Sequence, residues 1–169
     1  MDTVKEFVPP KRECGKCTAC CQGTLSGEAC GHFFFPGQPC HWVGESGCTV
    51  YEQRPPVCSG FKCSWLIDSF LPMWFQPNLS NIICTWQLWE DDSEGNKRSY
   101  LKAHSTNNGF IDPKYMRWLE TSRINCVVLN GAYAVTYLGS DEFKQWAIND
   151  RTKSSQSPEP DPPSEPHHT

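Results

Sequence analysis

Apolar residues recur with strand-like spacing mainly in the second half of the chain. Residues 82–89 alternate as a strand, and residues 99–104 follow a polar loop as its candidate hairpin partner. Asn130-Gly131 stands between the apolar runs 126–129 and 133–138. This dipeptide is typical of a tight hairpin turn because both central residues must adopt positive φ. The segment therefore predicts two hairpins.

Two helices are predicted from start signals that precede apolar residues at helical spacing. Asp112 is a candidate N-cap ahead of Pro113 at the first helical position, and Ser140-Asp141 begins the second helix. Their apolar faces are formed by Tyr115, Met116 and Leu119 and by Phe143, Trp146 and Ala147. The order strand-strand-helix-strand-strand-helix predicts an α+β fold in which two helices pack on a small antiparallel sheet.

The first part of the chain, residues 1–69, lacks this periodicity and is interrupted by glycines, so it is predicted to be mostly loop. One helix is expected near its end, after Pro55 or Pro56, because apolar residues recur there at helical spacing. Those residues are Val57, Phe61, Trp65 and Leu66. We expect residues 1–69 to form a cysteine-rich metal-binding module and residues 70–150 a small α+β segment packed on it. Residues 151–169 are rich in proline and poor in apolar side chains, which predicts a disordered tail.

Cysteine content changes the picture most. The chain has 169 residues and 11 cysteines, nine of which fall between Cys14 and Cys63. The N-terminus lacks the apolar stretch of a secretory signal, and no segment is apolar for the length of a membrane span. We therefore expect a reducing cytoplasm and no membrane partner, and under those conditions thiolates bind metals more often than they form disulfides. A net charge of −4 without a basic helix disfavours a nucleic-acid partner, while a protein partner stays open.

The densest chemical signal is the run Cys14-Gly15-Lys16-Cys17-Thr18-Ala19-Cys20-Cys21. A two-residue spacer lets two thiolates reach one metal while the intervening amides turn toward the sulfurs. Adjacent cysteines rarely serve one tetrahedral ion together, because the link between them is short. We therefore expect Cys20 and Cys21 to point to different places.

This run and two later elements resemble the CxxCxxCC, or YkgJ-like, family of cysteine-cluster proteins, which is described as chelating zinc or iron. The later elements are Cys48-Thr49-Val50-Tyr51-Glu52-Gln53-Arg54-Pro55-Pro56-Val57-Cys58 and Phe61-Lys62-Cys63. The resemblance covers about residues 14–66 and implies metal chelation. The cysteines of the family type are Cys14, Cys17, Cys20, Cys21, Cys40, Cys48, Cys58 and Cys63. Eight thiolates fill two tetrahedral zinc sites, or hold one iron–sulfur cubane and leave four for another site.

Three functions follow as hypotheses. The leading one is a small metal-binding protein that holds zinc or an iron–sulfur cluster. The second is an iron–sulfur redox protein or enzyme, suggested by the spacing of Cys14, Cys17 and Cys20. The third is a zinc-stabilised module for protein interaction. Some relatives, such as flagellin lysine methylases, carry the motif in larger enzymes. This chain lacks their length and a glycine-rich turn for a methyl donor, so we do not carry a methylase role over to it, and whether it is an enzyme stays open.

Several other residues in the first part of the chain are candidates for the site, but a structural role is expected for them. Cys30, His32 and His41 are additional to the eight thiolates, which already suffice, and whether one of the histidines replaces a thiolate in a site stays open. Arg54 either neutralises thiolates or forms an ion pair at a helix start with Glu52 or Glu45, and the ion pair is favoured.

The second half of the chain offers no group with ligand spacing. Cys84 and Cys126 are expected to be buried small hydrophobes, and His104 a satisfied histidine. Four of the seven tryptophans are expected to form core and cover for the metal module, rather than a binding surface. They are Trp65, Trp74, Trp86 and Trp89.

Overall fold

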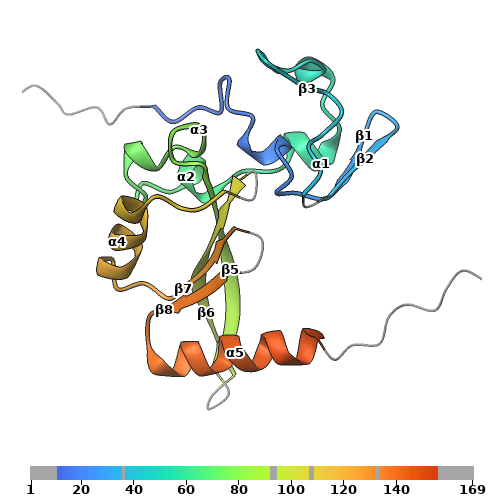
Figure 1. The fold of residues 1–169 in the computed structure, drawn as a ribbon. Helices are drawn as coiled ribbons and strands as arrows, with labels where there is room; N and C mark the ends of the chain where they lie inside the picture. The colour runs from blue at the N-terminus through green and yellow to red at the C-terminus, as the bar shows by residue number, and fades with distance from the viewer. Residues whose placement is uncertain (1–10, 36, 92–94, 107–108, 132–133, 156–169) are drawn as a thin grey trace, which may run out of the picture.

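A four-stranded mixed sheet lies at the centre of the molecule (Figure 1). The computed structural model describes residues 11–35, 37–91, 95–106, 109–131 and 134–155. β5 (Ile82–Asp91) pairs antiparallel with β6 (Asn96–Ser105), and β7 (Cys126–Asn130) pairs antiparallel with β8 (Ala134–Leu138). Both predicted hairpins and the α+β fold class are thereby confirmed.

The sheet differs from the predicted antiparallel sheet at one pairing, because β6 and β7 run parallel. Parallel neighbours cannot be joined by a tight turn and need a crossover connection. Here α4 (Pro113–Thr121) lies in that connection. The sequence shows the helix between the two hairpins but does not say which strands become neighbours.

The two faces of the sheet pack against different helices. Leu101 and Ala103 of β6 are fully buried on one face, in the same apolar cluster as Leu119 of α4. Tyr100 lies on the opposite face, where it packs with Phe143 of α5 (Asp141–Ser155). This alternation of neighbouring residues is the period-two pattern of a strand that is covered on both sides.

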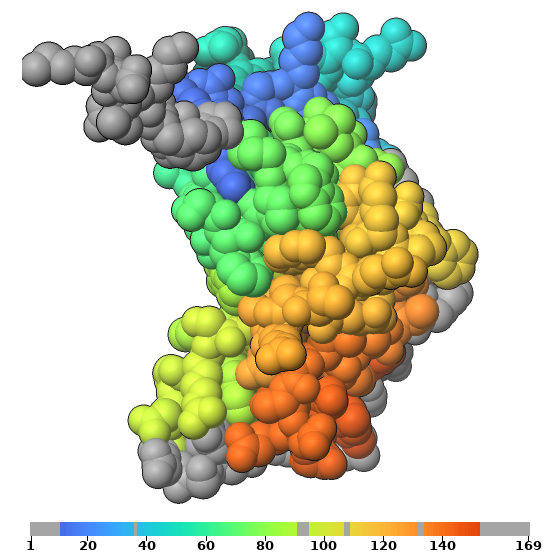
Figure 2. All heavy atoms as spheres, turned by 90° about the vertical axis from the view of Figure 1, so that its left-hand side faces the viewer, coloured from blue at the N-terminus to red at the C-terminus, as the bar shows by residue number. Residues whose placement is uncertain are grey.

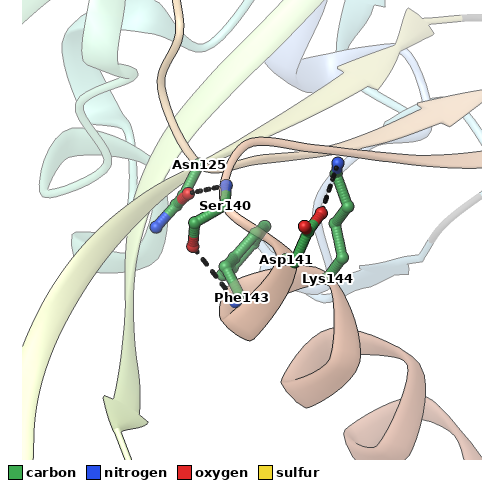
Figure 3. Close-up of polar contacts among 5 residues, drawn as sticks. All are labelled: Asn125, Ser140, Asp141, Phe143 and Lys144. Carbon is green, nitrogen blue, oxygen red and sulfur yellow. Dashed lines mark hydrogen bonds and ion pairs between the residues drawn. The ribbon is translucent and has the colours of Figure 1, made fainter.

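Both long helices begin at the caps that the sequence predicts. The Asp112 side chain accepts a hydrogen bond from the Lys114 backbone N–H at 2.9 Å, with Pro113 in the first turn. Ser140 Oγ accepts one from the Phe143 N–H at 3.2 Å (Figure 3). Such bonds satisfy backbone donors that a helix start leaves unpaired.

The turn before α5 requires a glycine at position 139. Gly139 has φ of +116°, and a Cβ there would collide with Asn125. The Asn125 side-chain oxygen accepts a hydrogen bond from the Ser140 N–H at 3.0 Å, which fixes the approach to the helix (Figure 3).

α5 runs further than the sequence suggests. Its last residues, 151–155, belong to the segment predicted as a disordered tail, so the predicted boundary at residue 151 is wrong. The helical pattern of Phe143, Trp146 and Ala147 fades before the helix ends, so the polar last turn carries no periodic signal. Residues 156–169 lie outside the described residues.

The cysteine-rich part of the chain lies at one end of the molecule, and α5 lies at the other (Figures 1 and 2). It is loop-rich, as predicted, and its regular elements are short. They are η1 (Ala19–Cys21), β1 (Gly27–Ala29), β2 (His32–Phe34), β3 (Val43–Gly44), β4 (Gly47–Cys48), η2 (Tyr51–Gln53), α1 (Pro56–Ser59) and α2 (Ser64–Ile67). η3 (Met73–Phe75) and α3 (Pro77–Ser80) lead from it into β5.

The single helix predicted between Pro55 and Leu66 is wrong, because α1 and α2 are separate. α1 ends at Ser59, Gly60 follows as its C-cap, and Cys63 is extended, with φ of −66° and ψ of 155°. Glycine disfavours a helix because its backbone has more conformational freedom in the unfolded chain, and this freedom is lost when the helix forms. The break presents Cys63 at the start of α2 rather than inside a helix.

Arg12 attaches the N-terminal segment to the end of α2. Its guanidinium donates hydrogen bonds to the backbone oxygens of Trp65 at 2.6 Å, Asp68 at 2.8 Å and Leu71 at 2.6 Å. A helix end leaves carbonyls without partners, and a cation suits their partial negative charge. Arg12 therefore holds the N-terminal segment against the end of α2.

Within the described residues, none of the helices has the length and apolar character that crossing a membrane requires.

All eleven cysteines are free thiols. The proposed division into residues 1–69 and 70–150 stays a prediction. One apolar cluster extends across that boundary, since it contains Cys63 and Trp65 together with Leu71 and Ile82.

Candidate metal centre

The eight cysteines singled out in the sequence line two cavities that share walls. The larger has a volume of about 160 Å³ and is lined by every one of the eight except Cys63. The smaller, of about 30 Å³, is lined by Cys63 together with Cys14, Cys17, Cys20 and Cys58. Segments up to 49 residues apart in sequence thus bring their thiols to one hollow region.

Turns at the N-terminal run explain how its thiols face one another. Gly15 has φ of +50°, a conformation that glycine adopts without steric cost. It allows the Cys17 N–H to reach back to the Cys14 oxygen at 2.9 Å. Ala19, at the start of η1, is buried against the sheet side and anchors the run.

The remaining thiols arrive on separate short elements. The Cys40 N–H donates to the Cys21 oxygen at 2.8 Å, which ties the two segments together. Cys48 ends the β3–β4 hairpin, opposite Val43. Cys58 lies in α1, and Cys63 immediately precedes α2.

Packing divides the thiols into two groups. Cys63, Cys17 and Cys20 belong to the large apolar cluster that contains the sheet core. Cys40, Cys21 and Cys58 belong to a separate small cluster built around Ala29 and Phe34.

Electrostatic neighbours follow this division in part and place the last two thiols. After burial, Cys14, Cys17 and Cys20 raise the pKa of Cys63, whereas Cys40, Cys48 and Cys58 act in that direction on Cys21. Cys58 lies between the two sets, because Cys20 as well as Cys40 and Cys48 acts to raise its pKa. We name the two sets group I and group II. Group I consists of Cys14, Cys17, Cys20 and Cys63, and group II consists of Cys21, Cys40, Cys48 and Cys58.

Cys20 and Cys21 are the point where the groups meet. Their sulfur atoms lie 3.9 Å apart and share a weak hydrogen bond. That bond, more than burial, raises the pKa of Cys20, and it lowers the pKa of Cys21. Both residues line the larger cavity, so the structure does not confirm the expectation that they point to different places.

Burial disfavours the thiolate form of four of these cysteines. It is the largest cause of the raised pKa of Cys14, Cys17, Cys58 and Cys63. Neighbouring thiols act in the same direction, because removing a proton from one disfavours removing it from the next. A positive charge placed among these thiols would lower their pKa values, since a bound cation favours the thiolate form over the thiol.

Three backbone amides and one guanidinium act against this burial and favour negative sulfur. The backbone amides of Ala19 and Asn78 lower the pKa of Cys17, and that of Leu66 lowers the pKa of Cys63. The Arg54 guanidinium lines both cavities and lowers the pKa of Cys14, Cys20 and Cys58. Amide and cation contacts of this kind stabilise thiolate ligands.

Arg54 does not make the expected helix-start ion pair within the described residues. Its guanidinium lies over the Tyr51 ring, 3.6 Å from the centroid, and its Nε donates to the Tyr51 oxygen at 2.9 Å. The interpretation that was disfavoured from the sequence, a cation facing thiols, is the one that its position supports. Asn78 was missed because a backbone amide has no signature in the sequence.

The other candidate residues lie outside both cavities. Cys30 is exposed, and His32 and His41 stack on one another with ring centroids 3.8 Å apart. Cys84 and Cys126 are 1% and 0% exposed in the sheet core, as predicted.

The donor set suits a thiophilic metal, since soft thiolates select zinc, copper(I) and iron–sulfur clusters. In the part of the chain that the structure describes, no three His, Cys, Asp or Glu side chains already form a metal-binding arrangement. The thiols therefore surround a common hollow without a closed coordination shell. The chain matches no family model, no curated protein and no solved structure with which it was compared.

Proposed function

We propose that this protein chelates metal through its eight clustered cysteines, holding zinc or an iron–sulfur cluster. The observation that carries the proposal is that all eight thiols line two cavities with shared walls, while Cys30, Cys84 and Cys126 do not. The same eight residues carry the resemblance to the CxxCxxCC, or YkgJ-like, family. Chelation is the property that this resemblance implies.

The chemistry of the hollow supports the proposal. Eight thiols that are partly removed from water have few partners, and burial without a partner costs free energy. A metal ion would supply that partner and would link four or more loop segments that share only a small apolar cluster. Arg54 would offset part of the negative charge of the thiolates.

Groups I and II each have the four thiols of one tetrahedral site. For zinc we therefore propose two sites side by side, which meet at Cys20 and Cys21. For an iron–sulfur cluster, group I is the stronger candidate, because its first three members share the spacing of ferredoxin-type runs. No catalytic step is proposed.

Elemental analysis and absorption spectra of protein purified without oxygen test this proposal. A colourless protein with about two zinc ions per chain supports two four-thiolate sites. A brown protein with stoichiometric iron and sulfide supports a cluster, and hence the redox alternative. Less than about one metal per chain, together with a fold unchanged by chelator, would refute the proposal.

Matched cysteine variants test the division into groups. Cys63→Ser removes a ligand of group I, and Cys40→Ser removes one of group II. Each is expected to lose about half of the bound zinc, because a three-thiolate site binds less tightly. Cys30→Ser makes the same chemical change in the same module outside the cavities, and it should keep the full metal content. Equal loss in all three variants would contradict the assignment.

A further inference from the structure

A cavity between α5 and the sheet lies away from the clustered cysteines. Its volume is about 360 Å³, and none of the eight clustered cysteines lines it. Ligand sites usually measure about 300–1,000 Å³ and combine apolar walls with a few polar groups. The metal-chelation proposal does not involve this cavity.

The strand register builds its floor from two rows of residues. In one row, Lys102 of β6 lies beside Val127 of β7, which lies beside Tyr137 of β8. In the next row, His104 lies beside Leu129, which lies beside Val135. All of these side chains are on the face opposite Leu101 and Ala103, whose side chains fill the main core.

α5 covers only part of this face. Phe143 near its start packs against Trp89 and Tyr100, with ring centroids 5.5 and 5.2 Å apart. Further along the helix, Trp146 and Ala147 line the cavity. The next residue, Ile148, is 46% exposed and does not line the cavity, and the residues after it are polar, so the helix does not fill the space above the two rows.

Two ionisable side chains in the cavity have neither a hydrogen-bond partner nor a counter-ion among the described residues. Lys102 and His104 are both half-buried, and the structure gives neither a hydrogen bond nor an ion pair with any described residue. Half-burying an ammonium group without a counter-charge costs free energy. Burial and the charge of Lys102 lower the pKa of His104. Arg151 and Asp150 at the exposed rim carry opposite charges, so Lys102 leaves the cavity positive.

We propose that this cavity binds a small organic anion with a flat apolar body. The acidic group of the ligand meets Lys102 and a donor nitrogen of His104, and the flat body lies among Tyr137, Trp146 and Val135. The half-buried lysine explains the charge of the ligand, and the aromatic walls explain its shape. This is a second binding function, independent of metal.

A matched pair of fluorescent probes tests the proposal on the full chain. 8-Anilinonaphthalene-1-sulfonate carries an anionic group, and N-phenyl-1-naphthylamine has the same aromatic body without it. Titration should show saturable binding of the anionic dye at one site and weaker binding of the neutral one. Lys102→Met removes the charge but keeps the apolar stem, and should weaken the anionic dye at least about tenfold while leaving the neutral dye unchanged.

Two further variants control for dye bound elsewhere. Lys97→Met removes an exposed lysine on the same strand that lies outside the cavity lining, and should bind both dyes as the parent does. Val135→Trp fills the cavity and should weaken both dyes. Equal affinity of the parent, Lys102→Met and Val135→Trp for the anionic dye would overturn the proposal, as would equal binding of the two dyes by the parent.

Discussion

Arg12 is expected to contribute more to stability than any other charged surface residue near the cysteines. Three of its hydrogen bonds to backbone oxygens are between 2.6 and 2.8 Å, and its guanidinium also lies 5.3 Å from the Trp65 ring centroid. A hydrogen bond to a charged group contributes about 1.5–3 kcal/mol. The three bonds share one partly exposed side chain, so they do not add fully. We expect Arg12→Met to lower the free energy of unfolding by about 2–4 kcal/mol, because it leaves three carbonyls without that donor.

The assay is urea unfolding followed by tryptophan fluorescence, with the same metal concentration for every variant. A loss of this size should also lower the melting temperature by roughly 4–16 °C, at about 2–4 °C per kcal/mol for a chain of this length. Arg12→Lys keeps the charge but not the fork of donors, so an intermediate loss is expected. Lys11→Met is the matched control. Lys11 is 85% exposed in its side chain and pairs only with Glu13, a kind of contact that contributes little.

Two results would refute this reasoning. A change below about 0.5 kcal/mol in Arg12→Met, equal to that of Lys11→Met, would show that the guanidinium does not close the end of α2. Full retention of stability in Arg12→Lys would show that charge alone, and not the bonds to three carbonyls, is what matters.

Three further predictions concern the thiols and α5. In the native protein, Cys30 should react with a thiol reagent within the first phase, whereas Cys84 and Cys126 should react only after denaturation, as mass spectrometry of the labelled peptides would show. Burial raises the pKa of Cys126 to about 12 from an ordinary value near 9. The unfolded chain therefore loses this proton first, so stability present below about pH 9 should decline as pH rises toward about 12, and Cys126→Ala should flatten that decline in urea titrations. Ser140→Ala removes the cap of α5 and should cost about 1 kcal/mol in the same unfolding assay.

The second half of the chain was predictable because its signals are local. Asp112 and Ser140 each bond to a backbone N–H two or three residues away, so the sequence alone contains both partners. The Asn130-Gly131 turn likewise fixes the β7–β8 hairpin through backbone conformation. The parallel pairing of β6 with β7 was missed because it depends on where a crossover helix packs, which no local signal states.

The candidate metal centre was predictable as a set of residues but not as an arrangement. Spacing and resemblance identified the eight cysteines, and the structure brings the same eight to one region. The assignment of Cys63 and Cys40 to different groups depends on packing between segments that are distant in sequence. The position of Arg54 also depends on such packing. The sequence does not show whether its guanidinium lies beside a carboxylate or at a thiol-lined cavity.

The candidate ligand cavity left a weaker signal. Tyr100, Lys102 and His104 are alternate residues of a predicted strand, so they had to share one face. In the structure α5 lies over this face, and two ionisable side chains on it are inconsistent with a closed apolar core. These two side chains indicate a cavity on this face, but the residues that line it are known only from the register of β6, β7 and β8.

The two thiol groups are attached to different parts of the protein, and this bears on how metal binding would couple to folding. Group I shares its apolar cluster with the sheet, through Cys63 and the 3%-exposed Trp65. Group II rests on a small cluster built around Ala29, Phe34 and Cys40, which is too small to hold the β1–β4 loops by itself. If the proposed function holds, removing the metal with a chelator should therefore speed amide hydrogen exchange first in residues 27–48. The amides of β5 and β6 should stay protected from exchange by the sheet core. The sheet then serves as a scaffold for group I, and the metal would serve as the scaffold for group II.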